Sequence, residues 1–127
     1  MSQAAFTFDA RPSLEDALRT LTAQVTDEIG PSKKLRKFAV FVQHNLAVVA
    51  LIERFACEAH ASGRRHYGMK AIVERARWEA SITTRSADWK FDNRHTAYLA
   101  RLVVIRFPEL RDLFELRRLH PEGARAA

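Results

Sequence analysis

The chain has 127 residues, of which 47% are hydrophobic and 28% are charged, and its formal net charge is +6 at pH 7. This size is typical of one domain with a core of its own, and the composition excludes a chain that is disordered throughout. The single cysteine, Cys57, excludes an internal disulfide and a cysteine-rich zinc site, so we expect it to be a small buried residue in a reducing, cytoplasmic compartment.

The charge is distributed unevenly along the chain. Residues 1–31 contain two basic and five acidic side chains, a net of −3, whereas the remainder contains 19 basic and ten acidic ones, a net of +9. Within that remainder, residues 64–106 have ten basic and four acidic side chains. A basic body behind an acidic first helix favours an anionic partner such as nucleic acid, although many proteins are basic without a specific partner.

The two ends of the single domain, 1–127, are predicted to be irregular. We expect residues 1–12 to form an extended lead-in and residues 120–127 to form a frayed tail. The lead-in lacks the basic start and apolar run of a signal peptide. The longest apolar stretch, residues 46–52, is too short for a bilayer, which needs about 20 residues, so we expect no membrane association.

The first helix is predicted to begin after Ser13 and to end at Gly30. Ser13 is a favourable N-cap, and negative charge at Glu15 and Asp16 suits the positive end of the helix dipole. Apolar residues recur along this segment at spacings of three and four, which indicates one buried face.

The second helix is predicted to follow Ser32, which can cap it, and to stop near His44. Its first turns contain four cations: Lys33, Lys34, Arg36 and Lys37. Such a cluster is either an edge that contacts phosphates or the solvated face of an ordinary helix, and the second case is the more common one.

Further helices are predicted over 46–61, after Asn45 as a cap, and over 69–82. The helix over 46–61 is apolar nearly all round, which favours a central position. Residues 63–68, "GRRHYG", form a basic turn between the two. The polar connection 83–93 follows, and it allows a small hairpin or wing.

The last two helices are predicted over 94–107 and from Pro108 onward, where proline suits a first helical position. Together these elements indicate a mainly α protein, a compact single domain of five or six helices. A helix-turn-helix arrangement is compatible with this order of elements.

Three segments together resemble a family of small uncharacterised helical proteins from bacteria and their phages. They are "YGMKAIVERARWE" (67–79), "WKFDNRHTAYLAR" (89–101) and "PELRDLFELR" (108–117). The resemblance covers about residues 38–118, and Asp92 stands where the family often has asparagine. It implies a compact helical domain in a phage or prophage setting, and it implies no particular reaction.

Motifs for catalysis are absent from the sequence. There is no phosphate-binding glycine loop, no G-x-S-x-G and no H-E-x-x-H, and the five histidines share no ligand spacing. The best catalytic set is Glu74, Asp88, Asp92 and His95, with Lys90 nearby, which could hold a divalent metal for phosphodiester cleavage. An ion pair of Glu74 with Lys70 or Arg77, and helix capping by Asp92, explain the same residues more simply. We therefore expect no enzyme, no cofactor and no metal.

The favoured function is the binding of nucleic acid, and double-stranded DNA is the preferred candidate. Polar residues at the leading end of helix 94–107 are placed as in helix-turn-helix proteins, where that end reaches base edges. A competing helix-turn-helix pair is 46–61 with 69–82, joined by the shorter turn. The candidate contact residues are Arg64, Arg65, Lys70, Arg77, Lys90, Asn93, Arg94, His95, Thr96 and Arg101.

Two further interpretations stay open. Trp78, Trp89 and Tyr98 could stack on exposed bases, but aromatic residues at helical spacing are more often structural. The protein could instead be an interaction module or inhibitor that acts on a host or phage protein. In a homodimer, the acidic first helix would dock on the basic body of a second copy, which would also suit a palindromic DNA site.

Overall fold

The computed structural model of the chain describes residues 11–84, 93–116 and 118–120, and for residues 81–84, 93 and 94 it describes the backbone alone. The elements in these ranges are α2 (Leu14–Ile29), α3 (Lys33–His44), α4 (Leu46–Ala61), α5 (Met69–Thr84), α6 (Asn93–Arg106) and the short 3-10 helix η1 (Pro108–Leu110). Five α-helices and no strand are found in the part of the chain that is described. The predicted mainly α fold of five or six helices is confirmed.

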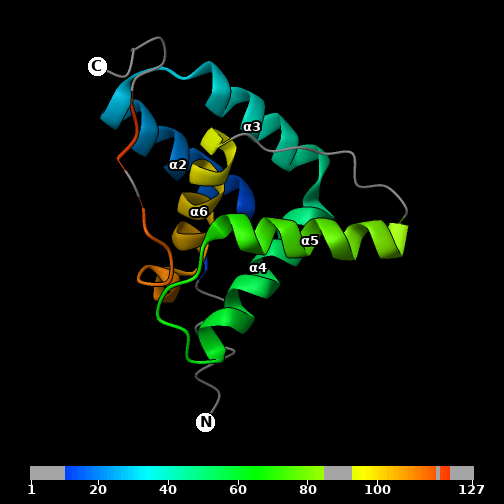
Figure 1. The fold of residues 1–127 in the computed structure, drawn as a ribbon. Coiled ribbons are helices and arrows are strands. Elements are labelled where there is room, and N and C mark those ends of the chain that lie inside the picture. Colours follow the sequence, from blue (N-terminus) through cyan, green and yellow to red (C-terminus); the bar gives the residue numbers. More distant parts are fainter. Residues whose placement is uncertain (1–10, 85–92, 117, 121–127) are drawn as a thin grey trace.

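The helix α6 is the central element of the described fold. It contacts α2, α3, α5 and η1, while α4 packs along α5 and also contacts α3 and η1 (Figure 1). The prediction that helix 46–61 is central was wrong. That helix is rich in alanine, and its outer face leaves Ala47 and Ala50 exposed and Leu46 57% exposed, so it covers the core from one side.

Of the caps predicted at Ser13, Ser32 and Asn45, the first two are confirmed. Oγ of Ser13 accepts a hydrogen bond from the backbone N–H of Asp16 at 3.1 Å, and Oγ of Ser32 accepts one from Leu35 at 2.9 Å. Asn45 stands at the start of α4, but its side chain makes no capping bond there. Its Nδ2 instead donates to the carbonyl of Phe41 at 2.9 Å, and so closes the end of α3.

The chain turns sharply at Asn45, where the axes of α3 and α4 differ in direction by 95°. Among the described helices, no single one has the length and apolar character needed to cross a bilayer. Within the described ranges, one bent pair of helices, α3 with α4, reaches that length and composition when the two are taken together.

One hydrophobic core joins all the helices. Its largest fully buried side chains include Phe38 of α3, Phe55 of α4 and Tyr98 of α6. The Tyr98 hydroxyl lies 3.0 Å from Oγ of Ser32, which is itself buried, so the one polar atom of this ring has a partner inside the core. The prediction that Tyr98 is structural is confirmed.

The predicted last helix from Pro108 is wrong in its type and length. The structure has one 3-10 turn, Pro108–Leu110, followed by non-helical turns. The carbonyl of Leu113 accepts a hydrogen bond from the backbone N–H of Tyr67 at 2.8 Å, so it is used in a tertiary contact. The irregular path also lets Leu110, Leu113 and Phe114 all enter the core.

Two other predicted features are only partly described. The backbone of α5 continues to Thr84, two residues beyond the predicted end. The possible hairpin or wing near 83–93 falls almost wholly outside the described residues, as do the extended lead-in before residue 11 and the tail after residue 120.

Candidate nucleic-acid interface

The first turns of α3 present the densest group of exposed cations. Leu35, Phe38 and Val42 of this helix are buried, which places the residues between them on the outer side. The exposed cations are Lys33, Lys34, Arg36 and Lys37, which we call the α3 basic surface. A hollow of about 410 Å³ is lined by Lys33, Arg36, Lys37 and Val40.

This charge pattern is unfavourable for the helix itself. The cations occupy the positive end of the helix dipole, and α3 has no acidic residue in its first turn. Lys33 lies three and four residues before Arg36 and Lys37, a spacing at which like charges repel by a few tenths of a kcal/mol per pair. Arg36 and Lys37 form no ion pair with any other residue in the described ranges. An anion bound here would relieve both effects.

A second basic surface begins in the connection between α4 and α5 and continues into the first turn of α5, and we call it the 64–70 basic segment. Its cations, Arg64, Arg65 and Lys70, are all exposed. The guanidinium of Arg64 lies over the ring of Tyr67, 5.3 Å from its centroid, and the backbone of Tyr67 is held by Leu113. Arg65 and Lys70 make no ion pair within the part of the chain that is described. The three cations are therefore exposed on a segment whose backbone is held at Tyr67 by its hydrogen bond to Leu113.

Two other predicted contact residues are already paired with carboxylates. Arg77 lies 3.0 Å from Glu74, which confirms the simple explanation of Glu74 as an ion-pair partner. Arg101 lies 3.5 Å from Glu28 of α2, and its side chain is only 17% exposed. Glu28 also accepts a hydrogen bond from the backbone of Leu119 at 2.8 Å, so Arg101 belongs to a contact that joins α2, α6 and the C-terminal segment.

The leading end of α6 is partly covered by α3. His95 and Thr96 are half-buried, and the His95 ring lies 5.9 Å from the ring of Phe38. The backbone of Asn93 begins the helix. The side chains of Asn93 and Arg94 lie outside the described residues, as do Asp88, Trp89, Lys90 and Asp92 as a whole. The roles predicted for these side chains, as nucleic-acid contacts, stacking rings or helix caps, therefore concern a part of the chain outside the described residues.

The described members of the predicted contact set and the α3 basic surface do not form one surface. The start of α3 and the segment 62–68 lie at opposite ends of the view in Figure 1. Lys70, Thr96 and Arg101, from α5 and α6, instead line a common cavity of about 480 Å³. The described members of the predicted set are therefore divided among several places: the exposed Arg64 and Arg65, the cavity-lining Lys70, Thr96 and Arg101, the paired Arg77 and the half-buried His95.

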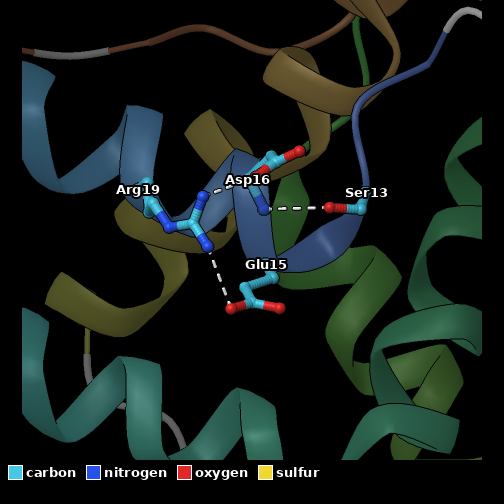
Figure 2. Close-up of polar contacts among 4 residues, drawn as sticks. All are labelled: Ser13, Glu15, Asp16 and Arg19. Atoms are coloured by element: carbon cyan, nitrogen blue, oxygen red, sulfur yellow. Dashed lines mark hydrogen bonds and ion pairs between the residues drawn. The ribbon is translucent and has the colours of Figure 1, made fainter.

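The acidic first turn of α2 is compensated within its own helix. Arg19 donates to Asp16 at 2.8 Å and to Glu15 at 3.0 Å, and Ser13 caps the same turn (Figure 2). Both carboxylates thus already have a cationic partner, and this weakens the charge attraction that a second copy would feel toward this end of α2.

A partly buried ion pair joins α4 to the end of α6. Nη1 of Arg106 lies 2.7 and 2.8 Å from the two carboxylate oxygens of Glu53. Burial raises the pKa of Glu53, and the charges of Arg106 and Arg11 oppose that rise. Arg11 forms an ion pair with Glu109, and its hydrogen bond lowers the pKa of that carboxyl.

No metal site is apparent in the ranges that the structure describes, since no three histidine, cysteine or acidic side chains converge there. Cys57 is half-buried beside the core, and burial raises its thiol pKa, which favours the protonated form over the nucleophilic thiolate. Glu74, the leading catalytic candidate, is exposed and paired with Arg77.

The α3 cations are a candidate contact surface that the predicted set of ten residues does not contain. The signal that could have placed them there is their spacing around three apolar positions, 35, 38 and 42, which fixes the outer face of the helix.

Comparison with protein-family models, curated proteins and solved structures gives no match to this chain.

Proposed function

We propose that the protein binds nucleic acid without catalysis, and that the α3 basic surface is the main contact. The observation that carries this proposal is the exposure of four cations within five residues at the start of α3. Phosphate groups of a nucleic acid supply closely spaced negative charges that match such a cluster, and their neutralisation releases bound counterions. The 64–70 basic segment is a second contact, suited to a separate part of the same polyanion.

Double-stranded DNA is the proposed ligand, and contact with its backbone is the proposed mode. Arg36 and Lys37 are well placed for phosphates, because they are exposed and have no carboxylate partner among the described side chains. Arg77 and Arg101 are removed from the contact set, since their charges are offset by Glu74 and Glu28. Two points are predictions from the sequence: that a helix approaches a groove of the DNA, and that either α6 or the pair α4 and α5 acts as a helix-turn-helix unit.

A regulatory role in a phage or prophage setting rests only on the sequence resemblance. The alternative function is an interaction module or inhibitor that acts on a host or phage protein. Val40 and Leu46 lie on α3 and α4 close to the bend, and both are more than half exposed, which would suit such a partner. A metal-dependent nuclease has no support in the described side chains beyond Glu74.

The experiment compares two variants with the same loss of charge. Arg36→Gln/Lys37→Gln removes two unpaired cations of the α3 basic surface. Arg19→Gln/Arg54→Gln removes two exposed cations that are already paired with Asp16, Glu15 and Glu58. We expect the first variant to weaken duplex DNA binding roughly tenfold at low salt and the second to change it by less than about threefold.

Equal weakening of DNA binding by the two variants would show that the affinity depends on net charge alone. The α3 basic surface would then not be the main contact. Absence of DNA binding by the unmodified protein at low salt would overturn the proposed function and favour the protein-partner alternative.

A further inference from the structure

A cavity lies between the start of α5, the middle of α6 and the C-terminal turns. Its volume is about 480 Å³, within the range of roughly 300–1,000 Å³ that is common for small-molecule sites. The residues that line it are Gly68, Met69, Lys70, Thr96, Ala97, Ala100, Arg101, Phe114, Glu115 and Leu116.

The lining has an apolar part and a charged part. Met69, Ala100 and Phe114 are buried core residues that reach the cavity from three different segments. Lys70 and Arg101 add two cations, against the single carboxylate of Glu115. Lys70 is exposed, so its charge is available at the mouth, while Arg101 lies deeper and shares its charge with Glu28.

The small side chains explain why space remains here. Ala97 and Ala100 lie three residues apart on α6 and so face the same side of the helix, where larger residues would fill the cavity. The backbone on the opposite side is fixed, because Tyr67 donates to the carbonyl of Leu113 at 2.8 Å. The cavity is therefore bounded by elements that the core and this hydrogen bond hold in place.

We propose that this cavity binds a small amphipathic anion, an organic carboxylate, sulfonate or phosphate monoester with an apolar or aromatic body. The apolar body lies against Met69, Ala100 and Phe114, and the anionic group lies toward Lys70. This site is separate from the α3 basic surface, although it shares Lys70 with the 64–70 basic segment, and it is filled in the absence of nucleic acid.

The test uses two fluorescent probes in the absence of nucleic acid. One is anilinonaphthalene sulfonate, an aromatic anion, and the other is phenylnaphthylamine, its uncharged counterpart. We expect the anionic probe to bind more tightly than the uncharged one. Lys70→Gln is expected to weaken binding of the anionic probe by about two- to fivefold, the effect of one exposed charge pair, and to leave the uncharged probe unchanged. Arg54→Gln is the control, because it removes an exposed cation that lines neither this cavity nor the hollow on α3 and belongs to neither basic surface.

A second pair of variants tests the location. Ala97→Leu fills the cavity from a half-buried position, and we expect it to weaken both probes at least about tenfold. Ala50→Leu makes the same change at an exposed site on α4 and is expected to have no effect. Thermal unfolding of each variant shows that it is folded at the temperature of the titration.

Equal probe binding by the unmodified protein and by folded Ala97→Leu would overturn the site. Equal affinity for the two probes, unchanged by Lys70→Gln, would overturn its preference for anions. Neither result tests the contact of the α3 basic surface with DNA, which is measured without the probes.

Discussion

Glu53 of α4 and Arg106 at the end of α6 form an ion pair that is largely shielded from water. Nη1 of Arg106 contacts both carboxylate oxygens, and its Nε donates to the carbonyl of Pro12 at 3.2 Å. Arg11 in turn donates to the carbonyl of Arg106 at 2.9 Å. These contacts connect the chain before α2 with α4 and α6, three segments that are far apart in the sequence.

This pair gives the first prediction. Glu53→Ala leaves the guanidinium of Arg106 partly buried without its partner, so we expect the free energy of unfolding to fall by about 3 kcal/mol. Glu53→Met combined with Arg106→Met removes both charges and fills the space, and we expect it to be less destabilised than Glu53→Ala. Urea denaturation measures both values. A double variant as unstable as the single one would show that the pair is not coupled in this way.

A second prediction compares two serine caps. Ser32 caps α3 inside the core and also contacts the hydroxyl of Tyr98, whereas Ser13 caps α2 at an exposed position. We expect Ser32→Ala to cost about 2–3 kcal/mol, because it leaves a buried hydroxyl unsatisfied as well as removing a cap, and Ser13→Ala to cost about 1 kcal/mol. The same urea experiment measures the difference, and equal costs would argue against the buried contact.

The third prediction concerns stability at acid pH. The Arg11 hydrogen bond lowers the pKa of Glu109, so the charged carboxylate favours the folded state. Its contribution is present above the ordinary glutamate pKa and is lost as the pH falls through the lower, folded-state value. Glu53 acts in the opposite sense: burial raises its pKa, so stability falls as the pH rises from the ordinary value to the raised one.

Glu109→Gln should therefore lose less stability than the unmodified protein on acidification. Unfolding free energies measured at several pH values between neutral and acid would show a flatter acid limb in the variant. Parallel curves for the two proteins would mean that the Arg11 contact does not favour the charged form in the folded state.

The fourth prediction contrasts two aromatic residues. The sequence favoured packing for both Trp78 and Tyr98, but Trp78 is 65% exposed, so that prediction was wrong for Trp78. We expect Trp78→Ala to change the free energy of unfolding by about 1 kcal/mol or less, and Tyr98→Ala to lower it by about 3–5 kcal/mol. Chemical denaturation distinguishes these outcomes, and a large loss for Trp78→Ala would indicate that it packs against the domain after all.

Local sequence signals predicted the helices well. Ser13 and Ser32 marked true helix starts, because a cap is a contact between neighbours in the chain. The bounds 46–61 were matched by α4, where the apolar run is long and bounded by Asn45. The helix expected after Pro108 failed because the path there is set by a hydrogen bond to Tyr67, far away in sequence.

The site was harder to predict for the same reason. Sequence shows that Arg101 is basic but not that Glu28, on another helix, lies 3.5 Å from it. It likewise shows no sign that Lys70 and Ala100 line one cavity, since that depends on how α5 and α6 cross. The exposure of the α3 cations could have been predicted from the sequence, because it follows from the spacing of the buried residues in the same helix.

The central claim, that the α3 basic surface contacts nucleic-acid phosphates, is tested most directly by the salt dependence of duplex DNA binding. The logarithm of the binding constant is expected to fall linearly with the logarithm of salt concentration, by about 0.9 per phosphate contact. We predict that Arg36→Gln/Lys37→Gln makes this slope shallower by about 1.8, the loss of two contacts, while Arg19→Gln/Arg54→Gln leaves it nearly unchanged. Equal slopes for the unmodified protein and the α3 variant would contradict the account.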